Sequence, residues 1–177
     1  MKQYVIFSLM VVTFLLSSIS ASAVDGYKDL KFGATKAVIL KNSGYSFLKS
    51  SVDQPGVEMY SCVDFKFGNK IVEAAALFVN NKFLRFVIVV PIDQIQGIVA
   101  NLQEKYGAAS SSSPQASFQA VDTHPNTEAF LAFDNNTIYL KISSDSNLIQ
   151  SALLIYTSPD YDKHILATQK AGFAGDL

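Results

Sequence analysis

The clearest pattern of apolar and polar positions lies between residues 70 and 91, KIVEAAALFVNNKFLRFVIVVP. Two apolar runs rich in β-branched and aromatic residues flank Asn80-Asn81, and asparagine tolerates the positive φ that a two-residue hairpin turn requires. Because both faces of this hairpin would be largely apolar, we expect it in the centre of a sheet. The expected cross-strand pairs are Val79 with Lys82, Phe78 with Phe83 and Ala76 with Arg85.

Apolar periodicity and turn residues predict further elements on both sides of the hairpin. Helices are predicted over residues 36–42, after Thr35 as N-cap, and over residues 92–106, where apolar residues recur every three or four positions before Gly107. The serine-rich residues 108–117 are predicted to be a flexible connector. Ser158-Pro159-Asp160 is typical of the start of a short final helix. Strands are predicted over residues 57–67, 128–134, 137–143 and 148–157.

Two turns are compatible with the sequence between the strand at 57–67 and the central hairpin. A two-residue turn at Gly68-Asn69 would place Asp64 opposite Glu73, and like charges directly across a strand pair are destabilising. A turn that also includes Lys70 would place Phe65 opposite Glu73 instead. We therefore expect the longer turn.

An internal similarity relates the two halves of the chain. Residues 73–88 align without gaps to residues 128–143, with Glu, Ala, Phe, Asn and Asn identical at equivalent positions. The alternative is that two Asn-Asn hairpins arose independently. The similarity predicts two helix-plus-three-strand units, residues 32–90 and 91–157, within a single domain covering residues 24–177. The expected fold class is α+β, a mainly antiparallel sheet with its helices packed on one face.

Residues 1–23 have the pattern of a secretory signal peptide. A short positive start is followed by an apolar run and by Ala21-Ser22-Ala23, which fits the A-x-A cleavage pattern. A membrane-spanning helix needs about 20 apolar residues, and this run is shorter. We therefore expect cleavage before Val24 and no stable membrane anchor afterwards.

Composition narrows the expected compartment and partners. The formal net charge of −1 gives no basic excess, so nucleic acid is not an expected partner. Cys62 is the only cysteine, so the chain has no internal disulfide. Small eukaryotic secreted domains are usually disulfide-rich. These features favour a bacterial protein that is periplasmic or secreted.

Residues 27–36, YKDLKFGATK, resemble the opening before the first helix in outer-membrane assembly lipoproteins of the SmpA/BamE type. The tandem helix-plus-sheet organisation is similar to the β-lactamase-inhibitor-protein fold. Together these resemblances imply protein binding through a sheet surface. The chain departs from the lipoprotein pattern in having no lipidation cysteine, in having Ala34 where methionine is usual and in lacking a second helix paired with the first.

Candidate catalytic and metal-binding residues are few. Asp160 and His164 would lie one helical turn apart, but a zinc site needs three or four converging ligands, and His124 is expected in an exposed turn. Cys62 has no basic neighbour in its predicted strand that would favour a thiolate. We therefore expect no enzyme activity, no metal site and no cofactor.

Arg85 is the only arginine in the chain and has two interpretations. As a structural residue it would be ion-paired or would extend its charge to the sheet boundary, because an isolated buried charge is costly. As a functional residue it would bind a carboxylate of a ligand or partner. The structural interpretation is favoured.

Alternation along the two hairpins divides the predicted sheet into two faces. Phe83 and Val87 align with Ile138 and Ile142, so this side is expected to face the helices. The other side mixes apolar rings with charges, which is typical of a protein-recognition surface. Alternatively, the connector or a second copy of the chain, in a homodimer, covers it. The candidate binding residues are Glu73, Leu84, Arg85, Phe86, Phe130, Tyr139 and Lys141.

The sequence therefore leads to two functional hypotheses. The first is an exported module that binds another protein through this sheet face, as an inhibitor, an immunity factor or an envelope-assembly accessory. The alternative is a periplasmic carrier that encloses a small apolar or acidic ligand, with Arg85 pairing its acid group. An enclosed apolar cavity would favour the carrier, and an open aromatic sheet face would favour protein binding.

Overall fold

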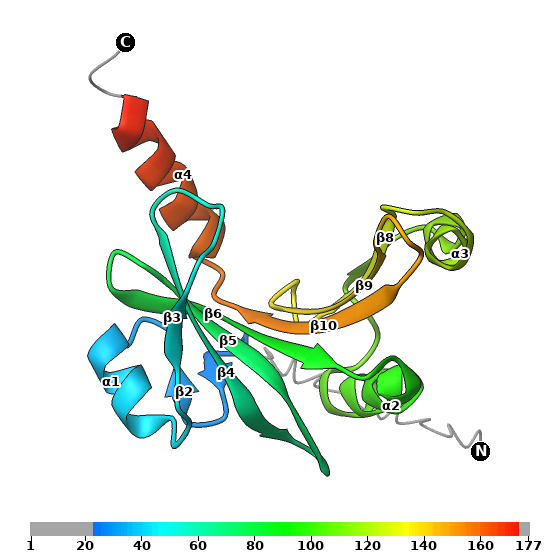
Figure 1. Cartoon of the computed structure of the whole chain (residues 1–177), viewed down its shortest axis with the longest axis horizontal. Coiled ribbons are helices and arrows are strands. Elements are labelled where there is room, and N and C mark those ends of the chain that lie inside the picture. The colour runs from blue at the N-terminus through cyan, green and yellow to red at the C-terminus, as the bar shows by residue number, and fades with distance from the viewer. Residues whose placement is uncertain (1–22, 174–177) are drawn as a thin grey trace, which may run out of the picture.

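The computed structural model describes residues 23–173, which fold into one antiparallel sheet with helices around it (Figure 1). The fold is α+β, as predicted. The residues of the predicted signal peptide before Ala23 lie outside the described part of the chain. The elements are β1 (Gly26–Tyr27), β2 (Leu30–Lys31), α1 (Lys36–Asn42), β3 (Leu48–Ser50), β4 (Val57–Phe67), β5 (Lys70–Val79), β6 (Lys82–Val90), a 3-10 turn (Ile92–Gln94), α2 (Ile95–Tyr106), β7 (Ser111–Ser112), α3 (Gln115–Thr123), β8 (Glu128–Phe133), β9 (Ile138–Ser144), β10 (Gln150–Thr157) and α4 (Tyr161–Phe173).

The main sheet has the strand order β3-β4-β5-β6-β10-β9-β8-β7, and all neighbouring strands are antiparallel. Two three-strand meanders, β4-β5-β6 and β8-β9-β10, meet where β6 pairs with β10. The β5–β6 hairpin therefore lies in the centre of the sheet, which confirms the expectation drawn from its two apolar faces.

The central hairpin has the predicted turn but not the predicted register throughout. Asn80 and Asn81 have φ values of 50° and 64°, the left-handed conformation that a tight hairpin turn requires. Val79 faces Lys82 and Phe78 faces Phe83, as predicted, but Ala76 faces Phe86 and not Arg85. A β-bulge at Leu84 adds one residue to β6 and shifts the pairing beyond it.

This bulge decides which residues of β6 face the core. Side chains alternate between the two faces of a strand, so one extra residue moves every following side chain to the opposite face. Phe83, Phe86 and Ile88 are all fully buried in one hydrophobic core. Val87 points to the other face, opposite Ala75 of β5. The prediction that Phe83 and Val87 share a face is therefore wrong.

A second bulge lies in β4, at the position of the charge conflict found in the sequence. Phe67 pairs directly with Lys70, so the turn contains only Gly68 and Asn69, and the predicted longer turn is wrong. The pairing shifts between Cys62 and Phe65, so two residues, Val63 and Asp64, lie opposite the single residue Glu73.

One face of the sheet, called here the helix-covered face, carries the main hydrophobic core. The β1–β2 hairpin, α1 and α2 contribute Tyr27, Leu30, Ile39 and Leu102 to it. Aromatic rings fill its centre, with Phe86 close to Tyr27 and Phe65 at centroid distances of 4.9 Å and 5.3 Å. Stacked and edge-to-face pairs of this kind add to the free energy of apolar burial.

Both helices predicted from periodicity are present. Helix α1 begins after Thr35 and ends at Asn42, as predicted. The predicted helix at 92–106 is a short 3-10 turn followed by α2, and it ends at Gly107, whose φ is 80°. Glycine takes this conformation without the steric penalty that a Cβ atom brings.

The serine-rich residues 108–117 are ordered, contrary to the prediction of a flexible connector. They form the edge strand β7 and the first turn of α3, a helix that the sequence analysis missed. The serine hydroxyls hold this segment to the β8–β9 hairpin: Ser111 Oγ donates to Asn136 Oδ1 at 2.7 Å, and Ser113 Oγ accepts from the Phe130 amide at 3.0 Å. The short serine side chains thus hydrogen-bond to a side chain and to the backbone of the neighbouring hairpin.

The final helix packs on the face opposite to α1 and α2. Tyr161 and Ile165 of α4 are buried against Val79 and Leu84 of the central hairpin, in a second, smaller apolar cluster. Figure 1 shows α4 rising from the sheet on the side opposite to α1. The prediction that all helices pack on one face is therefore wrong, because α4 caps one end of the other face.

Candidate functional site

The face of the sheet that α1 and α2 leave uncovered, called here the open face, runs across β5, β6, β10, β9 and β8. The strand register places its side chains next to one another, with Val87 between Ala75 and Ile155, and Lys141 between Leu153 and Phe130. Most of these side chains are apolar. The open face consists of Ala75, Leu77, Val87, Val89, Leu153, Ile155, Tyr139, Lys141, Phe130 and, at its margin, Glu73 and Arg85.

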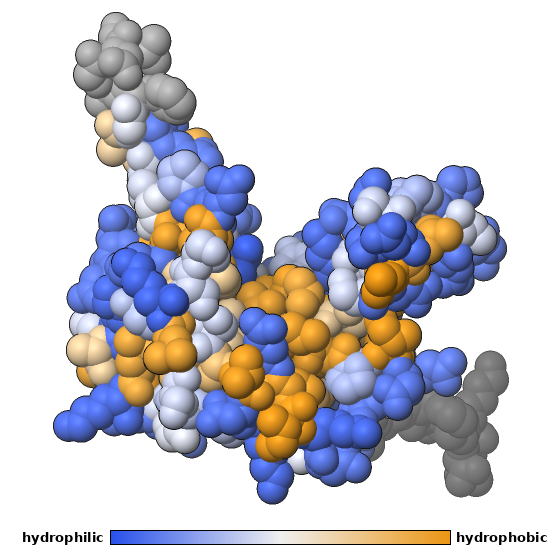
Figure 2. All heavy atoms as spheres, in the orientation of Figure 1, coloured by the Kyte–Doolittle hydropathy of each residue, from blue (hydrophilic) through white to orange (hydrophobic). Residues whose placement is uncertain are grey.

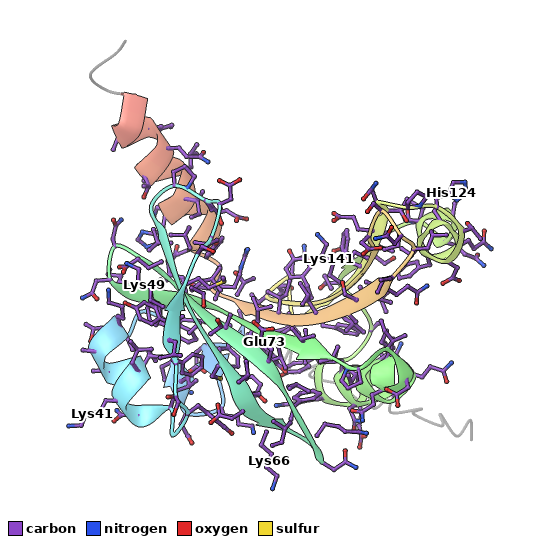
Figure 3. All side chains as sticks on the ribbon, viewed as in Figure 1. Lys41, Lys49, Lys66, Glu73, His124 and Lys141 are labelled. Atoms are coloured by element: carbon purple, nitrogen blue, oxygen red, sulfur yellow. The ribbon has the colours of Figure 1, made fainter. Side chains whose placement is uncertain are left out.

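The open face is concave. The sheet curls so that α4 borders it on one side and the end of the sheet near α3 borders it on the other (Figure 1). Figure 2 shows a continuous apolar area in the hollow between α4 and the end of the sheet near α3. Glu73 is labelled near the centre of the molecule in Figure 3, which has the same orientation. Val89 on this face is 38% exposed, and toward the β4–β5 turn Ile71 of β5 and Val63 of β4 are exposed at 65% and 78%. A contiguous exposed apolar patch of this kind marks an interaction site more often than a scatter of single residues does.

Apart from Arg85 at its margin, four of the predicted binding residues lie on the open face. Glu73 is exposed on β5, and Phe130 of β8 lies 5.8 Å from Tyr139 of β9, measured between ring centroids. Lys141 forms an ion pair with Glu128 beside these rings. The strand register brings the three residues from β8 and β9 together, whereas Glu73 lies across β6 and β10 from them.

Two predicted binding residues are not available on this surface. Phe86 is fully buried in the core of the helix-covered face, because the bulge at Leu84 reverses its direction. Leu84 lies in the cluster that α4 covers and is 2% exposed. Neither residue can contact a partner in this fold, so both assignments are wrong.

Arg85 lies at the base of α4 and is held by that helix. Its guanidinium stacks on the ring of Tyr161 at 3.5 Å from the centroid, and its Nε donates to Thr157 Oγ1 at 3.2 Å. Asp162 lies 3.9 Å away and is exposed to solvent. Burial lowers the pKa of Arg85, while Tyr161 and Asp162 act in the opposite direction. These contacts agree with the structural interpretation of Arg85.

The remaining candidate groups do not converge on a reactive centre. Burial, reinforced by Asp64, raises the pKa of the Cys62 thiol to about 11, so the nucleophilic thiolate is disfavoured. His124 ends α3, with its Nδ1 2.8 Å from Thr123 Oγ1, and His164 lies in α4. Within residues 23–173, no three His, Cys, Asp or Glu side chains are close enough to share a metal ion.

Part of the open face was not predicted from the sequence. Val89 and Leu153 form a cross-strand pair on it, and Val63 and Ile71 are exposed beyond its margin, near the β4–β5 turn. Simple alternation from Phe83 assigns Val89 to the core, because it takes no account of the extra residue in β6. The only available signal was the run Phe86-Val87-Ile88-Val89-Val90, which is apolar at every position and therefore gives no preference for one face.

A pocket of about 840 Å³ lies on the other side of the molecule, between β1, α2 and β10. Arg85 does not line it. The carrier hypothesis in its original form, with Arg85 pairing the acid group of an enclosed ligand, therefore has no support from this geometry.

The chain belongs to a protein family described as "Uncharacterised protein", whose profile matches residues 27–176. It is similar to an uncharacterized protein of Haemophilus influenzae, with 28% identity over 159 residues that cover 89% of this chain and 90% of the relative. No solved structure gives a significant match. The resemblance to SmpA/BamE-type lipoproteins and to the β-lactamase-inhibitor-protein fold stays a prediction.

No helix within residues 23–173 combines the length and the apolar composition needed to cross a bilayer.

Proposed function

We propose that this protein is an exported binding module that holds a partner protein against the open face of its sheet. The observation that carries the proposal is the concave, apolar surface between α4 and the β8–β9 end of the sheet. No helix of the described chain covers its middle, where Val89 is 38% exposed beside Leu153. A partner would bury these side chains as it binds, and that burial would supply most of the binding free energy.

The surroundings of the open face indicate the kind of partner. Its margins carry both signs of charge, from Glu73, the Lys141–Glu128 pair and the Arg85–Asp162 pair. Charges at a rim orient a partner more than they strengthen binding. We infer an amphipathic partner segment whose apolar side fills the hollow and whose flanking charges meet the rim. The mechanism is steric, since the module occupies a surface of its partner.

Site-specific photo-crosslinking in cells tests this proposal. A photo-crosslinking amino acid is placed at position 89 on the open face and, as a control, at position 38. Val38 is also an exposed apolar residue, at 48%, but it lies on α1. We expect position 89 to form a discrete adduct with another protein and position 38 to form none. Val89→Glu should abolish capture by a second open-face position, Leu153, whereas Val38→Glu should not.

The outcomes distinguish the possible occupants of the face. An adduct made only with a second copy of this chain would show that the open face is a homodimer interface and would overturn the proposal. Equal labelling from positions 89 and 38 would overturn it as well, because it would show that the apolar hollow has no preferred partner.

Export is a separate part of the proposal and has its own test. It rests on the signal-peptide pattern of residues 1–23. The protein recovered from the cell envelope should begin at Val24 when its N-terminal sequence is read. A chain that retains residues 1–23 in the cytoplasm would contradict it.

Internal duplication is also a proposal. The mirrored order of the two meanders supports it, as do Phe78 and Phe133, which align in the sequence and are both fully buried at the ends of their strands. The helices of the two halves differ, since α1 lies in the first half and α2 and α3 in the second.

A further inference from the structure

The pocket on the helix-covered side has the size and lining of a small-molecule site. Its volume of about 840 Å³ falls within the roughly 300–1,000 Å³ typical of ligand pockets. Segments far apart in the chain build it: Val24 to Lys28 at the N-terminus, the β4–β5 turn, one face of α2 and the middle of β10. The open face lies on the opposite side of the sheet, so the two sites are separate.

The inner wall of the pocket is apolar and aromatic. Leu102 and Leu154 are buried members of the main core and also line the pocket. Tyr27, Tyr106 and Tyr156 add rings, and burial raises the pKa of Tyr27 to about 12 and raises that of Tyr156 as well. The hydroxyls of Tyr27 and Tyr156 therefore stay protonated at neutral pH and can donate hydrogen bonds to a ligand. The wall suits an apolar body with polar atoms at one end.

Gly97 of α2 lines the pocket and is exposed. It lies inside α2, where glycine costs about 1 kcal/mol of stability relative to alanine. Glycine in a helix is often explained by close packing, but a Cβ atom at Gly97 would have no heavy atom within 4 Å. Its backbone also has no positive φ that would require glycine. A side chain at this position would therefore meet open space at the pocket wall.

The charged groups around the pocket favour an anion. Lys28 and Lys105 line it, and neither forms an ion pair within the described part of the chain. Two carboxylates also line the pocket. One of them, Asp25, accepts hydrogen bonds from Lys31 Nζ at both carboxylate oxygens, at 2.8 Å and 2.9 Å. Asp93 is the other. The ammonium groups of Lys28 and Lys105 therefore outnumber the one carboxylate, that of Asp93, that has no ion-pair partner within the described residues.

We propose that the pocket between β1, α2 and β10 binds an anionic amphiphile, a molecule with one apolar chain and one acidic head group. The apolar chain lies against Leu102, Leu154 and the tyrosine rings. The head group lies near Lys28 and Lys105. This inference is independent of the proposed partner on the open face.

Calorimetry with three matched probes tests the ligand class. Dodecanoate, dodecanol and dodecylammonium share one apolar chain and differ in the charge of the head group. The protein is used as recovered from the cell envelope. We expect dodecanoate to bind more tightly than dodecanol, and dodecylammonium to bind weakest. Equal affinity for all three would overturn the anionic assignment, and no binding of any would overturn the site itself.

Two variants locate the binding site. Gly97→Leu should fill the pocket and reduce dodecanoate affinity by at least about tenfold, while its higher helix propensity preserves or raises the melting temperature. Gly172→Leu is the matched control, because Gly172 also lies in a helix with no heavy atom near a Cβ position but is in α4, away from the pocket. If Gly172→Leu weakened binding as much as Gly97→Leu, the pocket would not be the site.

The lysines are tested by charge removal. The double variant Lys28→Gln/Lys105→Gln should weaken dodecanoate binding about fivefold and leave dodecanol binding unchanged, because only the charged head group contacts these residues. Lys41→Gln/Lys163→Gln removes the same charge from exposed helix positions outside the pocket and should change neither. Equal effects of the two double variants would show a general electrostatic effect and would contradict the assignment of the head group.

Discussion

At the scale of single residues, Phe86 shows how an aromatic side chain can be assigned to the wrong face. It has contacts with the rings of Tyr27, Phe65 and Phe83, at centroid distances of 4.9 Å, 5.3 Å and 6.3 Å. Tyr27 and Phe65 come from β1 and β4, which are distant in the chain, whereas Phe83 lies in the same strand as Phe86. Phe86 therefore joins the β1–β2 hairpin to the centre of the sheet and has no exposed surface.

Phe86→Ala should lower the free energy of unfolding by about 3–5 kcal/mol, because it removes a fully buried ring and leaves a cavity among other rings. Phe130→Ala, on the partly exposed open face, should lower it by about 1 kcal/mol or less. Urea denaturation of both variants measures the difference. Equal losses would contradict the assignment of Phe86 to the core and Phe130 to the surface.

At the scale of secondary-structure elements, α4 is attached to the sheet by few residues. Tyr161 is 2% exposed, its ring stacks with Arg85, and its hydroxyl donates to Gln54 Oε1 at 2.9 Å. Ile165 is the other buried residue of the helix in this cluster. A helix held by so small a cluster can open without unfolding of the sheet.

Tyr161→Ala should release α4 locally. We expect hydrogen exchange of the α4 amides to become at least about tenfold faster, while the amides of β5 and β6 keep their protection. Tyr161→Phe retains the stacked ring and loses only the Gln54 bond, so its effect should be much smaller. If β5 and β6 lost protection together with α4, the helix would be part of the cooperative core.

The elements themselves were largely predictable because their signals are local. The Asn80-Asn81 turn, the start of α1 after Thr35 and the end of α2 at Gly107 each depend on the conformation of a few neighbouring residues. Helix α3 was missed because its serine-rich approach looks like a linker. Its position depends on hydrogen bonds to the β8–β9 hairpin, whose residues come later in the sequence.

At the scale of the whole molecule, the core contains titratable groups that are neutral in the folded state. Burial raises the pKa of Cys62 from 9.0 to about 11 and that of Tyr27 from 10.0 to about 12. In the unfolded chain both groups lose their protons at lower pH. The folded state then binds more protons than the unfolded state, so stability falls as pH rises.

The free energy of unfolding should be insensitive to these groups below about pH 9 and should decline above it. The thiol contributes between pH 9 and 11, and the tyrosine contributes between pH 10 and 12. Cys62→Ala should remove the first part of the decline, on the order of 2 kcal/mol. Chemical denaturation at a series of pH values measures this, and an identical decline in the variant would contradict it.

The sequence by itself determined the α+β class, the central hairpin and the helices α1 and α2, because periodicity and turn residues act over short distances. Tertiary structure alone decided the direction of Phe86, the side on which α4 packs and the pocket beside Gly97. Each of these depends on residues that are far apart in the chain. In β6 every side chain after Lys82 except Arg85 is apolar, so alternation gave no preferred register. The bulge at Leu84 follows from packing, because it buries Phe83, Phe86 and Ile88 together on one face and leaves Val87 and Val89 on the other.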